Sequence, residues 1–271
     1  MCRATIITAN QDGTYKAKFR LSNFYLPHIN GTSVQHERPL YYVHSPFPTT
    51  DGDAVFFGPD TYFFLDFLRQ SQHLTRAKPP RTTVDVCCGS GAGAIEMSHV
   101  YKGSKVIGLD LNLRALELGR VNAKLADCAI EFVESDLYAA IGDRDDIDLI
   151  VSNPPYIASS SDGEVPVYAA GGAQQGLALP LRLVEEGLKV LVDGGLLMIY
   201  TGVPITIREP GRDPFLQRLQ QSKGAELVEY RIIHPDMWAE EVGIGAYADV
   251  GRIQVVGAVM RKRKSKEING L

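Results

Sequence analysis

The chain has 271 residues, of which 45% are hydrophobic, and a formal net charge of −4 at pH 7. This length supports a substantial core and fits one α/β unit with an appendage. No run of about 18 apolar residues occurs, which argues against a membrane span, and the acidic balance argues against a nucleic-acid partner.

Residues 1–75 are the first predicted region, a small β-rich substrate or lid region made of irregular strands and loops. Residues 17–21 alternate with a period of two and residues 40–43 are rich in strand formers, so both segments are predicted strands. A helix is predicted over residues 61–70, directly after Pro59-Asp60.

The aromatic side chains of this region have two interpretations. Phe63, Phe64 and Phe67 fit a core that joins the two regions of the chain, whereas other aromatic residues fit a lid over a substrate. Asp60 and Thr61 fit either a ligand contact or the N-cap of the predicted helix. The candidate substrate or lid residues are Tyr41, Tyr42, Phe57, Asp60, Thr61 and Tyr168.

From residue 82 onward predicted strands and helices alternate, which is typical of a doubly wound parallel sheet. Strands are predicted over 82–87, 105–109, 129–133, 147–152, 195–200, 226–233 and 252–260, the last of them antiparallel at the sheet edge. Helices are predicted over 94–101, 112–126, 174–191 and 213–222, with a helix-to-strand turn at Asp193-Gly194-Gly195. Residues 76–261 are predicted to be one domain, and the basic residues 262–271 a solvated tail.

A glycine-rich turn, with Gly89, Gly91 and Gly93, follows Asp85 and leads into the first of these helices. Glycines let a ligand approach the backbone, and a helix N-terminus presents N–H donors to it. The Gly-x-Gly-x-Gly spacing differs from that of a dinucleotide site. Asp85 would repel a pyrophosphate but can bind an ammonium, such as the amino group of a methionine moiety. A plain tight turn between strand and helix is the alternative.

Acids also end the next two predicted strands. Asp110 lies some 20 residues beyond the glycine turn, where an acid can bind ribose hydroxyls, and Asp136 can accept the amino group of an adenine. The candidate cofactor-binding residues are Asp85, Cys87, Gly89, Ser90, Gly91, Asp110, Leu111, Ser135, Asp136, Leu137 and Asn153.

The motif Asn153-Pro154-Pro155-Tyr156 directly follows the predicted strand 147–152. The Asn153 side-chain oxygen and the Pro154 carbonyl can accept two N–H bonds of an acceptor nitrogen, which leaves its lone pair aimed at a methyl carbon. The two prolines stiffen the backbone that presents these oxygens, and Tyr156 offers a flat face for a planar group. Because Asn-Pro is also a common turn dipeptide, a simple strand-ending turn is equally compatible with the motif alone.

In this order and spacing, the four motifs resemble the class I S-adenosylmethionine (SAM) methyltransferases, and more narrowly the branch that contains the glutamine methyltransferases of peptide-chain release factors. The resemblance covers roughly residues 54–260, and residues 170–177 resemble the Gly-Gly-x-x-Gly-Leu segment of those enzymes. It implies a seven-stranded Rossmann-like sheet, SAM as cofactor and nitrogen as the methyl acceptor. Cys87 departs from the pattern, since many relatives have glycine there. The helical bundle that grips the protein substrate in the release-factor enzymes is not recognised, which leaves the substrate open.

The sequence therefore predicts a SAM-dependent N-methyltransferase that acts on an amide or amine nitrogen of a small molecule or a protein. Asn153 and Pro154 are predicted to orient the acceptor and Tyr156 to pack on it. One alternative is a SAM-cyclising enzyme that forms azetidine-2-carboxylate and methylthioadenosine, since Cys87 can alter the conformation of the methionine end. Others are a nucleic-acid base N-methyltransferase, in which the same tetrapeptide occurs, and a SAM-sensing or scaffold protein.

The expected setting is cytoplasmic and reduced. The first residues lack the apolar stretch of a secretory signal, and the four cysteines have the spacing of neither a disulfide framework nor a zinc site. The six histidines are scattered, so no metal is expected. The chemistry needs none, because a sulfonium already carries a good leaving group and alignment supplies much of the rate.

Overall fold

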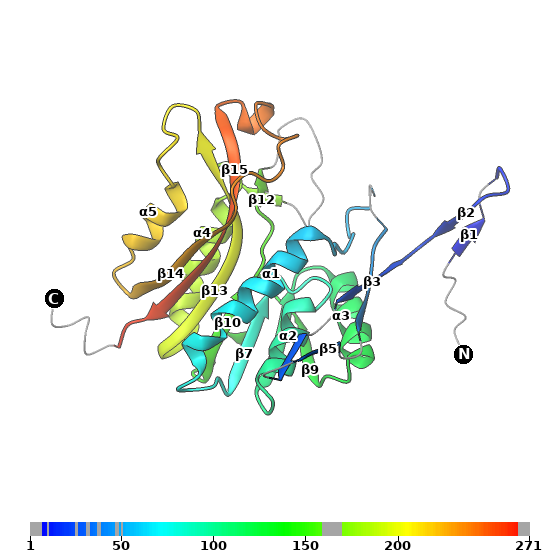
Figure 1. Ribbon diagram of the computed structural model, residues 1–271, viewed down its shortest axis with the longest axis horizontal. Helices are drawn as coiled ribbons and strands as arrows, with labels where there is room; N and C mark the ends of the chain where they lie inside the picture. Colours follow the sequence, from blue (N-terminus) through cyan, green and yellow to red (C-terminus); the bar gives the residue numbers. More distant parts are fainter. Residues whose placement is uncertain are drawn as a thin grey trace.

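The computed structural model describes residues 7–9, 11–24, 27–30, 33–36, 39–46, 49, 51–158 and 170–264. Its centre is a seven-stranded sheet in the order β14-β15-β13-β10-β7-β8-β9 (Figure 1). The strands are β7 (Thr82–Val86), β8 (Lys105–Asp110), β9 (Ile130–Glu134), β10 (Ile147–Ser152), β13 (Leu191–Thr206), β14 (Ala225–His234) and β15 (Val250–Lys262). The predicted doubly wound α/β sheet is confirmed.

Strand β15 is antiparallel to both of its neighbours, β13 and β14, whereas the other neighbouring pairs of this sheet are parallel. The predicted antiparallel direction is therefore right, but the predicted edge position is wrong, because β14 forms the edge. Burial explains the order: β15 is apolar and almost fully buried over residues 253–260, as expected of a strand covered on both faces, while β14 is only half-buried.

Helices cover both faces of the sheet. Helices α1 (Pro59–Gln70), α2 (Ala92–Val100) and α3 (Leu113–Leu125) pack on one face, and α4 (Ala178–Val190) and α5 (Pro214–Gln220) on the other. The short 3-10 helices are η1 (Ser71–Thr75), η2 (Ala139–Ile141) and η3 (Gly245–Tyr247). Arg69 of α1 holds the buried Glu96 of α2 through two bonds of 2.7 and 2.9 Å, which ties these helices together.

Two local differences from the predicted elements have backbone causes. Helix α4 begins at Ala178 rather than 174, because Gln174, Gln175 and Gly176 all have positive φ and form a turn. The predicted turn around Gly194 is present as an irregularity inside β13, where φ of +80° at this glycine coincides with a register shift against β10.

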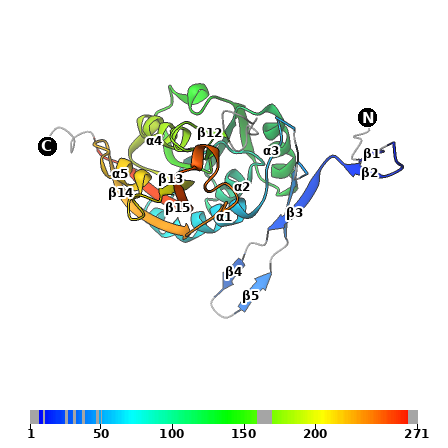
Figure 2. The same cartoon turned by 90° about the horizontal axis from the view of Figure 1, so that it is seen from above.

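The N-terminal region consists of antiparallel pairs. These are β1 (Ile7–Ala9) with β2 (Tyr15–Ala17), β3 (Arg20–Phe24) with β6 (Leu40–His44), and β4 (Pro27–Asn30) with β5 (Ser33–His36). Figure 2 shows the pairs β1–β2 and β4–β5 projecting away from the sheet, whereas β6 lies along α3. The strand predicted over residues 40–43 is confirmed as part of β6. The strand predicted over residues 17–21 is wrong as a single element, because β2 ends at Ala17 and β3 begins at Arg20. The role of this region as a lid stays a prediction.

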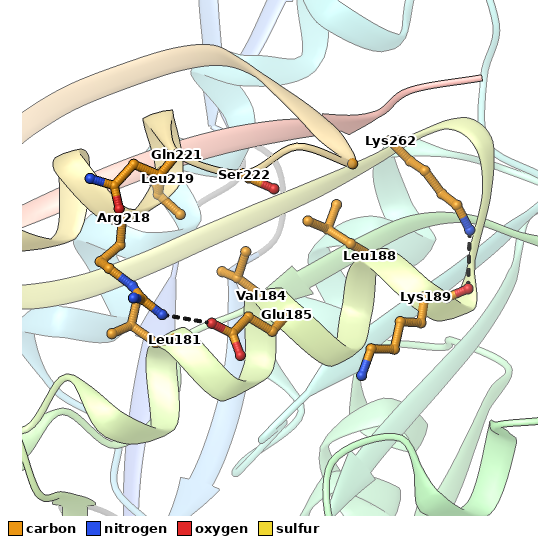
Figure 3. Close-up of a pocket in the computed structure, with 11 residues that line it drawn as sticks. Leu181, Val184, Glu185, Leu188, Lys189, Arg218, Leu219, Gln221, Ser222 and Lys262 are labelled. Carbon is orange, nitrogen blue, oxygen red and sulfur yellow. Dashed lines mark hydrogen bonds and ion pairs between the residues drawn. The ribbon is translucent and has the colours of Figure 1, made fainter. Parts of the chain in front are cut away.

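A cavity of about 660 Å³ lies between α4 and α5 (Figure 3). Its apolar lining includes Leu181, Val184 and Leu219, and an ion pair between Glu185 and Arg218 spans it. None of the predicted site residues lines this cavity. Across the described segments, no helix combines the length and the apolar character that a membrane crossing requires.

Candidate active site

The predicted motifs meet at one edge of the sheet. Because β7, β8, β9 and β10 are neighbouring parallel strands, the segments that follow them, from Cys87, Leu111, Ser135 and Asn153 onward, leave the same carboxyl edge. The chain runs outward from β7 to β9 and then returns to β10 on the other side of β7. Ligands of doubly wound folds bind at such a reversal of strand order, so the glycine turn and the Asn153 motif flank the expected ligand position.

The glycine turn has an open, left-handed backbone. Cys87, Gly89 and Gly91 have φ of 57°, 51° and 79°, and Gly91 is the N-cap of α2. A Cβ atom at Gly89 would meet nothing within 4 Å, so space for a ligand exists beside its backbone. The Gly89 N–H donates to the Asp110 carboxylate at 2.8 Å, which also accepts the Asn112 N–H at 2.9 Å.

Cys87 keeps the backbone conformation that glycine adopts readily, since its φ is positive. Burial and the charges of Asp110 and Asp85 raise the pKa of its thiol. The thiol is therefore neutral at pH 7 and a weak nucleophile.

Asn122 of α3 connects the glycine turn to the N-terminal region, a role that the sequence did not reveal. Its side chain is fully buried and donates to the carbonyls of Ser90 and Val43, while its oxygen accepts the Val43 N–H at 2.7 Å. A polar side chain that bonds to a distant backbone replaces water for three buried groups. The available signal was an asparagine inside a predicted helix, where this residue is disfavoured.

Asp85 is buried, and its carboxylate accepts the Ala94 N–H of α2 at 2.7 Å. The glycine at position 93 permits this contact, because a Cβ atom there would come within 2.7 Å of the Asp85 oxygen. Burial, together with the charge of Asp110, raises the pKa of Asp85 to about 8. The predicted contact with an ammonium stays a prediction, and such a partner would favour the ionised form.

We expect Asp85→Asn to stabilise the unliganded protein increasingly as the pH rises from 4 to 8. The folded state holds this proton more tightly than the unfolded chain, in which the group has its ordinary pKa of 3.8. The protonated Asp85 side chain therefore contributes its full stabilisation below pH 3.8, and this stabilisation is lost as the pH rises to about 8. Denaturant unfolding should show the variant gaining at least about 1.4 kcal/mol on the wild type over this range, the equivalent of one pKa unit. A difference that does not change with pH would contradict the assignment.

The third predicted cofactor segment follows β9 and is partly structural. The Ser135 hydroxyl bonds to the Leu137 carbonyl and the Ala140 N–H, and the Leu137 side chain is buried. Asp136 is half-exposed and forms an ion pair of 3.1 Å with Arg182. Leu111, next to Asp110, is 58% exposed and leaves an apolar side chain free at the edge of the site.

The Asn153 motif extends from β10 as a turn that is half-buried at Asn153 and buried at Tyr156. The hydroxyl of Ser152, the last residue of the strand, donates to the Val86 carbonyl at 2.6 Å and fixes the start of the turn against β7. The open aromatic face predicted at Tyr156 is not present, because the ring lies against β13, where a Cβ atom at Gly202 would come within 2.4 Å of it. Its hydroxyl donates instead to Asp60 at 2.6 Å.

The candidate lid residues divide into different environments. Tyr42 and Phe57 are buried and stacked with ring centroids 4.8 Å apart, so they belong to the core and the lid interpretation is wrong for them. Tyr41 is exposed on β6, and Tyr168 lies outside the described residues.

The predicted N-cap role falls to a neighbouring residue. Gly58 is the N-cap of α1, while the Thr61 hydroxyl accepts the Gly58 N–H at 3.3 Å. Asp60 is buried inside the first turn and accepts hydroxyls from Tyr156 and Tyr200. Neither residue is therefore the cap itself.

Two glycines of residues 170–177, Gly171 and Gly176, pack on the backbone of the Asn153 motif. Strand β12 (Ala170–Gly172) pairs with β11 (Ile157–Ala158), which directly follows Tyr156. A Cβ atom at Gly171 would come within 2.6 Å of the Tyr156 Cα, and one at Gly176 within 1.9 Å of the Tyr156 carbonyl oxygen. Only glycine fits these contacts, which explains the spacing of the motif.

Comparison with known proteins identifies the family of the chain. The chain matches the family described as methyltransferase small domain over residues 67–208. It is 34% identical over 158 residues to the release factor glutamine methyltransferase of Deinococcus radiodurans, covering 56% of this chain and 55% of that protein. It is 31% identical over 128 residues to the ribosomal protein uL3 glutamine methyltransferase of Neisseria gonorrhoeae, covering 44% of this chain and 42% of the other. The chain thus spans about half the length of these relatives.

Solved structures share the fold at low sequence identity. The 16S rRNA N2 G1207 methyltransferase of Thermus thermophilus superposes with a TM-score of 0.51 and 15% identity, over 90% of this chain and 51% of that one. At this identity the likeness shows the fold alone. The match to the family begins within α1 and ends just after β13. It includes the glycine turn, Asp110, Asp136 and the Asn153 motif. The chain belongs to the methyltransferase small domain family.

Proposed function

We propose that this chain is a SAM-dependent N-methyltransferase whose acceptor is the side-chain amide nitrogen of a glutamine in a protein. The observation that carries the proposal is the position of the Asn153 motif, which leaves β10 beside the glycine turn of β7 at the reversal of strand order. Relatives that act on release factors and on ribosomal protein uL3 support a protein glutamine over a small molecule.

The residues at this edge suit SAM. The space beside Gly89 accommodates a ligand next to the backbone, and two backbone N–H groups fix the Asp110 carboxylate while lone pairs stay available for ribose hydroxyls. The exposed Leu111 offers an apolar surface to an adenine ring. Asp136 would have to share its carboxylate between Arg182 and the adenine amino group.

In the proposed reaction SAM supplies a methyl group on a sulfonium. The Asn153 side-chain oxygen and the Pro154 carbonyl accept the two N–H bonds of the acceptor amide and hold its nitrogen facing that methyl. The methyl transfer would leave the electron pair of the broken C–S bond on the sulfur of S-adenosylhomocysteine, and the methylated nitrogen would release one proton to solvent. The contribution of the protein is orientation and exclusion of water, which can lower a barrier by several kcal/mol.

The direct test incubates the purified protein, methyl-labelled SAM and a release factor. We expect one methyl group on a single glutamine, detected by mass spectrometry, and none when that glutamine is replaced by asparagine. Methylthioadenosine formed from SAM alone would instead establish cyclisation, and label in RNA would establish base methylation. Either result would replace the proposal.

The cofactor assignment makes a separate prediction. Asp110→Ala should weaken SAM, S-adenosylhomocysteine and methylthioadenosine alike, because all three share the ribose. Loss of a charged hydrogen-bond partner costs roughly 1.5–3 kcal/mol, or about 10- to 150-fold in affinity. Asp85→Asn should weaken the first two ligands but not methylthioadenosine, which lacks the amino-acid moiety. Calorimetry on both variants separates the roles, and an equal loss for all three ligands in Asp85→Asn would contradict the ammonium contact.

A further inference from the structure

Four side chains from separate parts of the fold meet behind the catalytic motif. The hydroxyl of Tyr156 donates to one Asp60 oxygen at 2.6 Å, and the hydroxyl of Tyr200, in β13, donates to the same oxygen at 2.7 Å. The indole N–H of Trp238, in the connection between β14 and β15, donates to the Tyr156 hydroxyl at 3.0 Å. A hydrogen-bonded chain therefore runs from Trp238 through Tyr156 to the first turn of α1.

This cluster is buried and its donors are fixed. Asp60 is 5% exposed and Tyr200 is fully buried. Burial, followed by the nearby charge of Asp60, raises the pKa of both tyrosines, so they stay protonated and serve as donors. A buried carboxylate that accepts two hydroxyls has few alternative arrangements, because any rotation leaves a polar group unpaired at a cost of about 1–3 kcal/mol.

The catalytic motif is held at a second point by the same connection. The Ala158 N–H donates to the Tyr247 hydroxyl at 2.7 Å, two residues beyond Tyr156. Between Tyr156 and Asn153 lie two prolines whose φ is locked. A displacement of the Tyr156 ring is thus transmitted to Asn153 with little local relaxation.

We propose that Asp60 is a positioning residue, which anchors Tyr156 and thereby sets the orientation of the Asn153 side chain and the Pro154 carbonyl. The connection between β14 and β15 is part of the same device through Trp238 and Tyr247. The effect on turnover rests on the proposed methyl transfer, whereas the coupling between Asp60 and Trp238 does not.

The chain offers an internal control with the same chemistry. Tyr230 of β14 donates its hydroxyl to Asp213 at 2.6 Å, the same length as the bond from Tyr156 to Asp60. Tyr230 packs on the face of the sheet that carries α4 and α5, opposite the face on which Tyr156 packs. Tyr230→Phe therefore removes an equivalent bond without touching the catalytic motif.

Trp238 is the sole tryptophan of the chain, so its fluorescence reports on this cluster directly. In the unliganded protein, we expect Asp60→Ala and Tyr156→Phe to increase acrylamide quenching of Trp238 by at least about twofold. Asp60→Asn should retain the wild-type quenching, because its amide oxygen still accepts both hydroxyls. Tyr230→Phe should also match the wild type.

Kinetics with SAM and a release factor supply the second readout. Asp60→Ala should lower kcat by about 10- to 100-fold, as expected for loss of a buried hydrogen-bond acceptor, with the KM for SAM changed less than about threefold. Asp60→Asn should recover most of kcat. Because Tyr156→Phe keeps the ring in place, it tests the same bond if Asp60→Ala does not fold. The double variant Asp60→Ala/Tyr156→Phe should lose little more kcat than either single variant, since each single substitution already removes the same hydrogen bond.

Separate outcomes overturn the separate claims. Unchanged Trp238 quenching in both Asp60→Ala and Tyr156→Phe would refute the coupling, whether or not methyl transfer occurs. Changed quenching with a normal kcat would refute the positioning role. If the wild type does not methylate a release factor, the proposed substrate fails while the fluorescence result still decides the coupling. Loss of kcat in Asp60→Asn equal to that in Asp60→Ala would show that the charge, rather than the hydrogen bonds, matters.

Discussion

Asn153→Ala should lower methyl transfer by about 100-fold or more while SAM binding stays nearly unchanged. The side-chain oxygen contacts the acceptor nitrogen in the proposed geometry, so its loss misplaces the reacting atom without removing a cofactor contact, and misplacements on the order of 1 Å can cost about this much. Because the interaction matters most in the transition state, the loss should appear in kcat.

Calorimetry with SAM and turnover with a release factor, measured on the same preparation, decide this prediction. Unfolding of Asn153→Ala should match that of the wild type closely, since Asn153 is half-buried and the adjoining strand is fixed by Ser152. A tenfold loss of SAM affinity with normal turnover would refute the assignment of Asn153 to the acceptor.

Gly176→Ala should disrupt the Asn153 motif more severely than other changes near the site. A Cβ atom at this position would come within 1.9 Å of the Tyr156 carbonyl oxygen and 3.2 Å of the Ala158 nitrogen, both of which are backbone atoms. The backbone also has φ of +89°, which a side chain disfavours by roughly 1–2 kcal/mol. We expect overpacking to add about 1–3 kcal/mol to that strain and turnover to fall with the displacement of Tyr156.

Gly103→Ala separates these two contributions. Gly103 has φ of +91°, but a Cβ atom there would meet nothing within 4 Å. The free energy of unfolding of this control should therefore fall only by the cost of placing alanine in a left-handed backbone conformation, and its turnover should stay normal. Denaturant unfolding of both variants gives the comparison, and equal losses of stability would show that the contact with Tyr156 relaxes at little cost.

The order of strands and helices from Thr82 to the end of β15 was determined by local sequence. Apolar runs that suit a strand buried on both faces alternate with amphipathic helices, and a parallel sheet requires such crossovers. The ends of β7, β8 and β10 could be predicted for the same reason, because glycine, acidic and proline-containing turns directly follow apolar strands. Since parallel strands share one carboxyl edge, the order of elements also placed the glycine turn and the Asn153 motif at the same edge of the sheet. That they lie on neighbouring strands was decided by the strand order of the folded sheet.

Only the tertiary structure decided which side chains complete the site. Asp60 lies 96 residues before Tyr156 and 140 before Tyr200, and their hydrogen bonds form only once α1 packs on the sheet. Asn122 likewise joins the glycine turn to β6, and its partners Ser90 and Val43 lie 32 and 79 residues before it in the chain. No local pattern distinguishes a lid aromatic from a core one such as Tyr42, because both are aromatic side chains in a strand. Periodicity reports the face that a residue occupies within its own element, whereas the partner on that face depends on how distant elements pack.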